Sequence, residues 1–199
     1  MLTLLIDTST ERGIVAIADG LDLLFTQELP RGALSSSHLI SAIQTGFQRL
    51  KKSPHDLKRV GVGVGPGMFT GIRVGVATAK GISFGCGIPL IGFCSLQGFT
   101  SEAQGIFASV IDARVGGVYL LLQERKGDKI SLIGSPTLSS LEELPLKLQG
   151  CSTIVGPSFQ RLALPEAIEM SPDVAHLAKL VENSPPDAPF ELLYLRDSL

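Results

Sequence analysis

Two carboxylates at the ends of apolar runs are the residues with the clearest potential for chemistry. Asp7 closes the run LLID and Asp112 closes the run VID, so each follows an isoleucine at the end of a strand-like segment. A carboxylate at such a turn, with backbone N–H groups beside it, can hold phosphate and Mg²⁺. The side chain of Ser9, however, hinders the close approach of a phosphate to the backbone. We therefore do not expect independent ATP hydrolysis.

The same two turns are expected to have structural roles. Thr8 follows Asp7 directly, and Arg114 lies two residues after Asp112, where the two side chains can form an ion pair that fixes the turn. The alternative for Arg114 is that it reaches into the site of a partner protein. The sequence leaves both roles open.

The glycine-rich segment GVGVGPGMFTGIRVGVATAKG, residues 61–81, resembles a nucleotide-binding loop at first reading. It lacks the Gly-Lys-Ser/Thr of a P-loop, and its third glycine after Gly65 and Gly67 comes one residue too late for the dinucleotide-binding pattern. A phosphate loop is therefore poorly supported. Gly65-Pro66-Gly67 instead predicts a rigid turn between a strand and a helix, and Thr70 is the expected N-cap of that helix.

The helix expected at 70–85 has one face of small residues. At 100° per residue, Gly71, Gly75, Thr78, Ile82 and Gly85 fall within about 40° of a common line. Each interior glycine costs about 1 kcal/mol relative to alanine, so close packing must offset the loss. The face could pack on the chain's own sheet or on the preceding helix, or it could contact a second protein. We predict that Gly71, Gly75, Thr78 and Ile82 contact a partner.

Metal-ligand patterns are absent from the sequence. The three histidines, His38, His55 and His176, are far apart, and neither an HxxxH nor an HExxH pair exists. The three cysteines form no CxxC pair and are odd in number, which suits buried thiols in a reducing compartment. We therefore expect no metal, no catalytic residue and no cofactor that the chain binds by itself.

The chain consists of two similar halves. Each half begins with three short strand-like runs separated by tight turns, which predicts antiparallel hairpins, and continues with alternating strands and helices. The first strand of each half ends in Ile-Asp, at residues 6–7 and 111–112. This plan predicts a duplicated α/β fold of the actin-like (ASKHA, ribonuclease H-like) kind, with mixed sheets and a truncated second lobe. The N-terminal, partner-binding lobe is expected at 1–105 and the C-terminal lobe at 106–199.

The charge balance limits what the chain can bind alone. It has 199 residues, 44% of them hydrophobic, and a net charge of −2, whereas non-specific affinity for nucleic acid comes mostly from Lys and Arg. The basic cluster at 49–59 is either a solvated helix end or a contribution to tRNA binding within a complex. Charges and prolines interrupt every long apolar run, so no membrane span is expected. We expect a cytoplasmic protein.

Segments spread over nearly the whole chain resemble the TsaB (YeaZ) family. GVGPGMFTGIRVGVATAKGI resembles the GxGPGSFTGLRxGxxxAKGL signature of that family, with Met68 in place of the usual serine. The segments LLIDTST, SSSHLI, VIDARVGGVY, IVGPS and YLR match as well, whereas residues 128–190 match only loosely. Leu192 stands where the family usually has proline.

The resemblance implies a non-catalytic subunit in the synthesis of N6-threonylcarbamoyladenosine, at the tRNA adenosine 3′ of the anticodon. Such a subunit is a degenerate relative of the transferase TsaD and binds TsaD through helices of its N-terminal lobe. The ATPase TsaE and tRNA would join only in the complex, and ATP or ADP would bind only at the surface shared with the partner. The resemblance also allows a homodimer through similar surfaces.

Two other functions remain open on the sequence alone. An autonomous ATP-dependent kinase or hydrolase with an actin-like fold would need Asp7 for activity. A glycoprotease-type metallopeptidase would need stoichiometric bound metal, for which the sequence offers no ligand set.

Overall fold

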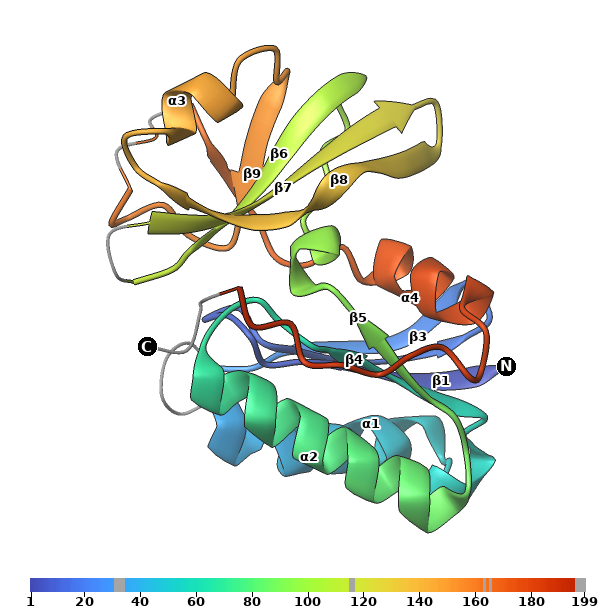
Figure 1. Cartoon of the computed structure of the whole chain (residues 1–199). Helices are drawn as coiled ribbons and strands as arrows, with labels where there is room; N and C mark the ends of the chain where they lie inside the picture. Colours follow the sequence, from blue (N-terminus) through green and yellow to red (C-terminus); the bar gives the residue numbers. More distant parts are fainter. Residues whose placement is uncertain (31–34, 115–116, 163, 165, 196–199) are drawn as a thin grey trace. The chain divides into compact units, whose positions relative to one another are not determined.

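A computed structural model of the chain describes residues 1–30, 35–114, 117–162, 164 and 166–195. Its contacts divide the chain into two compact units, shown with their elements in Figure 1. Unit 1 comprises Met1–Gly98 and Asp173–Leu193, and unit 2 comprises Phe99–Pro172 with the chain from Tyr194 onward. The first boundary lies at 98/99 where 105/106 was expected, and residues 173–193, expected in the C-terminal lobe, pack in unit 1 and complete its core.

Unit 1 is built on a five-stranded sheet in the order β3-β2-β1-β4-β5. The strands β1, β2 and β3 pair antiparallel as expected, and β4 and β5 run parallel to β1. All six residues of β1 are buried, because both faces of the sheet are covered at its centre. The strands are β1 (Leu2–Asp7), β2 (Ile14–Asp19), β3 (Asp22–Glu28), β4 (Arg59–Gly63) and β5 (Leu90–Phe93).

Helices cover both faces of this sheet (Figure 1). The helices α1 (Ser35–Leu50) and α2 (Phe69–Cys86) share one hydrophobic cluster with the sheet, which includes Leu39, Phe47 and Ile72. The helix α4 (Val174–Asn183) packs on the opposite face, against Leu5, Ile91 and Phe93. Short 3₁₀ turns follow α1 at Pro54–Asp56 and β5 at Ser95–Gly98. Unit 1 therefore has three layers, and its third layer comes from the C-terminal part of the chain.

The chain after α4 crosses to the other face of the unit 1 sheet. The Leu193 N–H donates to the carbonyl of Val64 over 2.9 Å, and Phe190, Leu192 and Leu193 pack against the same cluster as α2. At the other end of α4, the Asp173 N–H donates to the Gly98 carbonyl over 2.6 Å. The chain thus leaves unit 1 and returns to it at neighbouring points.

Unit 2 repeats the strand plan of unit 1. Its sheet has the order β10-β9-β6-β7-β8, with β6, β7 and β8 antiparallel and with β9 and β10 parallel to β6. From the opposite edge this is the order of unit 1, which confirms the predicted duplication and the actin-like α/β class. The elements are β6 (Gly105–Asp112), β7 (Gly117–Lys126), β8 (Lys129–Ser140), α3 (Leu144–Lys147), β9 (Thr153–Gly156) and β10 (Ile168–Glu169).

Among the residues that the structure describes, none of the helices combines the length and the apolar character needed to cross a lipid bilayer.

Candidate functional site

The carboxyl ends of the three parallel strands of unit 1 bring the predicted loop residues together. Asp7 ends β1, the turn Gly65-Pro66-Gly67 follows β4, and Ser95 follows β5. The Met68 N–H donates to the Ser9 carbonyl over 2.6 Å, and the Ser95 N–H donates to the Gly65 carbonyl over 2.8 Å. The predicted turn is present, and its Gly65–Pro66 peptide bond is cis. The turn is held by the chain's own backbone.

Glycines in this turn and in α2 make room for the loop after β1. A Cβ atom at Gly67 would overlap the carbonyl oxygen of Ser9, and one at Gly71 would overlap the carbonyl oxygen of Thr8. A Cβ atom at Gly75 would overlap the Thr8 hydroxyl. The same hydroxyl donates to the Gly71 carbonyl over 2.7 Å. The glycines therefore allow two segments of one chain to approach closely.

These contacts contradict the prediction that Gly71 and Gly75 contact a partner. Both are buried within unit 1, against Thr8. Thr78 and Ile82, from the same predicted face, are half-buried, and for them a partner contact stays a prediction. Only the N-terminal part of the predicted face, with Gly71 and Gly75, packs on the chain itself, whereas Gly85 at its other end is exposed. For Gly71 and Gly75 the alternative holds, in which α2 packs on other parts of its own chain.

The predicted N-cap at Thr70 is also wrong. The helix α2 begins at Phe69, so Thr70 lies within its first turn, and Met68 occupies the N-cap position without a side-chain hydrogen bond. The N–H of Ile72 donates to the Met68 carbonyl over 2.9 Å. The helix α2 begins directly after the Gly65-Pro66-Gly67 turn, and no side chain caps its N-terminus.

Asp7 is a buried carboxyl group at the centre of this junction. Its side chain accepts the Ser9 N–H over 2.8 Å, and a Cβ atom at Gly63 would overlap it. Burial raises the pKa of Asp7 above its ordinary value, although the nearby Ser9 N–H and the hydroxyls of Ser9 and Ser95 lower it in part. Neither hydroxyl forms a hydrogen bond of good geometry. The Asp7 side chain is therefore largely closed off from solvent, with 5% of the residue exposed.

The raised pKa of Asp7 predicts a pH-dependent stability. Since the folded state binds this proton more tightly, the stabilisation is complete below the ordinary value of 3.8 and is lost as the pH rises through the folded-state pKa. Asp7→Asn is expected to remove this loss and to raise Tm at pH 7.5 by about 2–4 °C for each kcal/mol gained. Thermal unfolding between pH 4 and 9 measures it. A lower Tm for the variant at pH 7.5 would contradict the burial argument.

Asp112 occupies the equivalent strand end of unit 2 but is ion-paired. Its carboxylate accepts the Arg114 N–H over 2.7 Å and lies 4.0 Å from Nε of Arg114 and 3.8 Å from Nε of Arg161. Arg114 has a φ of 68°, a left-handed conformation that this turn requires. This geometry is the one expected for a structural, turn-fixing role, whereas nothing in the sequence pattern pointed to Arg161. Asp112→Asn should lower Tm at pH 7.5, opposite to Asp7→Asn, because it removes the anion between two cations.

The basic cluster at 49–59 does not form one surface. The Arg59 side chain is buried, and its guanidinium donates to the carbonyl oxygens of Val181, Glu182 and Ser184 over 2.6, 3.1 and 3.4 Å. Arg59 therefore caps the C-terminus of α4. The other basic residues are exposed: Arg49, Lys51, Lys52 and Lys58.

Two further patterns do not form a catalytic site. The segment GISFG at 81–85 matches the GxSxG pattern of hydrolase nucleophiles, which requires a strand-to-helix turn. Ser83 instead lies within α2, and its hydroxyl donates to the Ile88 carbonyl over 2.6 Å. In the part of the chain that the structure describes, no three His, Cys, Asp or Glu residues gather as metal ligands.

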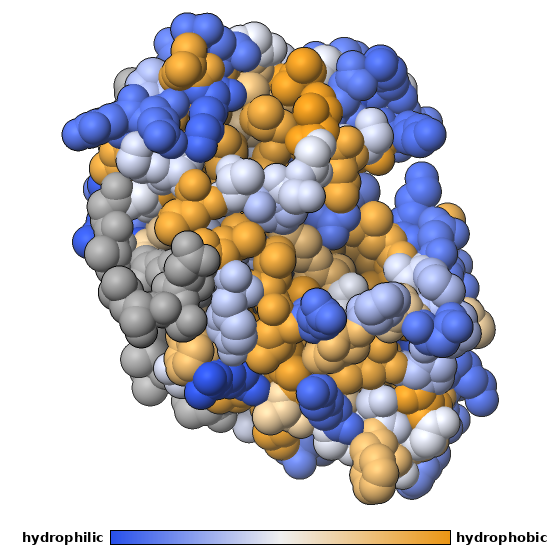
Figure 2. Space-filling view, viewed as in Figure 1, coloured by the Kyte–Doolittle hydropathy of each residue, from blue (hydrophilic) through white to orange (hydrophobic). Residues whose placement is uncertain are grey.

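The side of α2 that faces away from the sheet is open and apolar. Ala77, Gly81, Phe84 and Gly85 are exposed there; Phe84 is 92% exposed, and a Cβ atom at either glycine would meet no other atom within 4 Å. The centre of this side lies about 100° around the helix from the centre of the predicted face, and Gly85 belongs to both. We call these four residues the open face of α2. Hydrophobic residues are visible over a large part of unit 1 in Figure 2.

Comparisons with known proteins find TsaB proteins and the related TsaD transferases. Residues 32–180 match the family model "TsaD: tRNA N6-adenosine threonylcarbamoyltransferase". The tRNA threonylcarbamoyladenosine biosynthesis protein TsaB of Escherichia coli is 29% identical over 175 residues, which are 80% of this chain and 73% of that protein. A tRNA N6-adenosine threonylcarbamoyltransferase of Desulfitobacterium hafniense is 41% identical over 61 residues, 31% of this chain and 18% of that enzyme.

The solved structure of YeaZ from Pseudomonas aeruginosa has the same fold. It superposes with a TM-score of 0.76 at 20% identity and covers 90% of both chains. Of the segments that carry the sequence resemblance, residues 115–116 and 196 lie outside the described part of the chain. The matching family model, the curated relatives and the fold together show that the chain belongs to the TsaB (YeaZ) family, which is related to the TsaD transferases of tRNA threonylcarbamoyladenosine biosynthesis.

Proposed function

We propose that this chain is a non-catalytic subunit that binds a TsaD-type transferase and supports threonylcarbamoyl transfer to tRNA. The observation that carries the proposal is the open face of α2. It combines a 92% exposed phenylalanine with two glycines that leave the helix backbone accessible. A soluble helix that exposes an aromatic ring beside bare backbone is suited to close packing against another protein.

The closed junction around Asp7 supports a role without catalysis. In actin-like nucleotide-binding proteins, loops at the carboxyl ends of the strands must leave space for phosphate. Here Thr8 and Ser9 contact α2 and the turn before it, and Asp7 is 5% exposed. Under the proposal, ATP or ADP binds only at the surface shared with the partner, while TsaE and tRNA join the assembled complex in the cytoplasm.

Reconstituted tRNA modification tests the proposal directly. Threonylcarbamoyladenosine is measured with TsaC, TsaD and TsaE, with and without this chain. We expect modification to depend on the chain, and we expect the purified chain to hydrolyse no ATP. Modification that proceeds equally without the chain, or ATP hydrolysis by the chain alone that Asp7→Ala abolishes, would contradict it.

A matched pair of substitutions tests the open face of α2. Ala77 on α2 and Ala175 on α4 are both exposed helical alanines in unit 1. Ala77→Leu is expected to weaken binding of the TsaD-type partner by about tenfold or more, because added bulk separates closely packed helices. Ala175→Leu is expected to leave affinity within about twofold, since surface substitutions away from contacts have small effects. Titration calorimetry measures affinity, and circular dichroism confirms that both variants are folded.

A further inference from the structure

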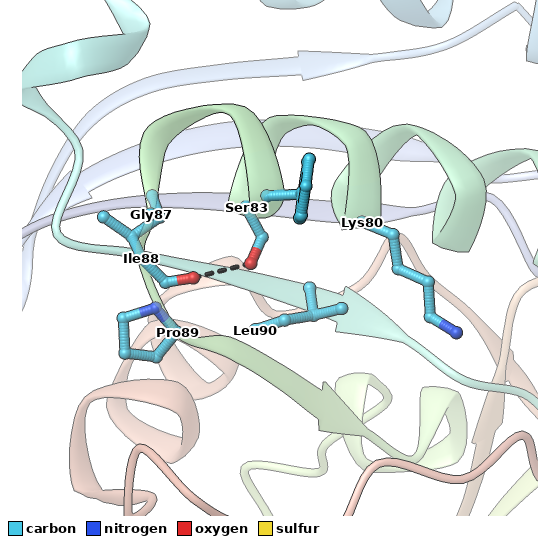
Figure 3. Close-up of a pocket in the computed structure, with 7 residues that line it drawn as sticks. Lys80, Ser83, Gly87, Ile88, Pro89 and Leu90 are labelled. Carbon is cyan, nitrogen blue, oxygen red and sulfur yellow. Dashed lines mark hydrogen bonds between the residues drawn. The ribbon is translucent and has the colours of Figure 1, made fainter.

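A groove lies where the C-terminal half of α2 meets the start of β5. Its volume is about 730 Å³, and most of its lining is apolar. Figure 3 shows the Ser83 hydroxyl donating to the Ile88 carbonyl, so this polar group is already satisfied within the chain. Phe84, on the open face of α2, also lines the groove. The labelled lining residues are Lys80, Ser83, Gly87, Ile88, Pro89 and Leu90.

Lys80 carries the only charge among the residues that line this groove. Its ammonium group lies 5.1 Å from the centre of the Phe190 ring. Within the described ranges it forms no ion pair with a carboxylate, not even with Glu191, the residue after Phe190. An apolar groove with one uncompensated ammonium group is complementary to an apolar side chain that has a carboxylate nearby.

The helices of this face carry basic residues and no acidic ones. The sequence of α2 contains Arg73 and Lys80, that of α1 contains His38 and Arg49, and neither helix contains Asp or Glu. A second copy of the chain that brought the same two helices would therefore offer Lys80 no carboxylate from them. Like charges across an interface lower its affinity and select against that pairing.

We propose that the groove receives an apolar side chain and an adjacent carboxylate of a different, acidic protein, and that Lys80 selects this partner over a second copy of the chain. The inference rests on the proposed function, in which the open face of α2 binds a TsaD-type transferase. It adds the chemistry that the matching surface of that transferase must have. The groove continues from the open face through Phe84, so one protein can occupy both.

Charge variants of Lys80 test the proposal in the full-length chain. Lys80→Glu is expected to weaken binding of the TsaD-type partner by about tenfold or more at low salt, and Lys80→Met by less, because the methionine keeps the apolar stem. Lys129→Glu, an exposed residue of β8 in unit 2, makes the same charge change and should stay within about twofold. Affinity is measured by titration calorimetry at 50 and 300 mM NaCl.

Self-association of the chain is a second measurement, and the Lys80 variants are not expected to weaken it as they weaken partner binding. Sedimentation equilibrium should show equal or stronger self-association for Lys80→Met and Lys80→Glu, since both remove repulsion between copies. If the wild-type chain binds the partner and Lys80→Glu binds within about twofold of it, the groove proposal fails while the proposed function stands. If the wild-type chain does not bind the partner, both fail. Weaker self-association of both Lys80 variants would also overturn the selection argument.

Cross-linking identifies the occupant directly. Phe84 is replaced by the photoreactive p-benzoyl-phenylalanine, which suits a position that is 92% exposed and tolerates a larger ring. Irradiation of the complex is expected to link a partner peptide that contains an apolar residue within a few positions of Asp or Glu. A linked peptide without an acidic residue, or efficient linking to a second copy in the presence of the partner, overturns the proposal.

Discussion

Gly71→Ala is expected to lower the free energy of unfolding by about 3 kcal/mol or more, because its methyl group overlaps a backbone carbonyl. That carbonyl belongs to Thr8, whose hydroxyl also bonds to the Gly71 carbonyl. A flexible side chain could move aside, but the loop after β1 is held by its own hydrogen bonds to Met68 and within the Asp7 turn. The overlap can therefore be relieved only if α2 moves away from the loop and from the sheet. Urea denaturation followed by circular dichroism measures the change.

Gly81→Ala is the matched control in the same helix. A Cβ atom at Gly81 meets no other atom within 4 Å. The change is therefore expected to raise the free energy of unfolding by up to about 1 kcal/mol, the difference in helix propensity. Equal destabilisation by both substitutions would show that the loop after β1 does not rest on α2 as described. The opposite signs separate backbone contact from general intolerance of α2 to change.

Arg59→Met should produce the second large loss of stability. The side chain keeps a similar apolar length but removes a charged donor from three carbonyls at the end of α4. Hydrogen bonds from charged groups contribute about 1.5–3 kcal/mol, and buried acceptors without partners add a desolvation cost. We expect a loss of about 3 kcal/mol, with the amides of α4 losing most protection in hydrogen exchange.

Arg49→Met is the comparison for this second prediction. Arg49 is exposed, and its guanidinium lies 5.7 Å from the centre of the Phe25 ring. The substitution should cost about 1 kcal/mol or less, the usual range for an exposed cation–π contact. If Arg59→Met costs no more than Arg49→Met, the capping of α4 does not hold that helix on the sheet.

Local patterns sufficed for the strands and for the duplication. The alternation of short apolar runs and tight turns predicted β1, β2 and β3, and the two Ile-Asp pairs marked equivalent strand ends of the two units. The structure adds the weak strand β10, only two residues long, which no periodic pattern could reveal. Such signals are readable because hairpins and neighbouring strands depend on nearby sequence.

Features that depend on distant residues could not be predicted from the sequence. Helical spacing grouped Gly71 with Gly75, but which side of α2 faces the sheet depends on Thr8, 63 residues away from Gly71. Arg59 is separated from its acceptor at Val181 by 122 residues, so in the sequence it resembled its exposed basic neighbours. The open face was missed for the same reason, because exposure depends on what the rest of the fold leaves uncovered.

The adjacency of Gly98 and Asp173 makes residues 99–172, most of unit 2, an insertion in the topology of unit 1. The chain enters this insertion after Gly98 and leaves it at Asp173, and these two residues are hydrogen-bonded to each other. Such an insertion can be lengthened, shortened or exchanged in evolution without changing the fold of unit 1. Selection can therefore act on the two units separately. A change in the length of residues 99–172 therefore need not alter the three layers of unit 1.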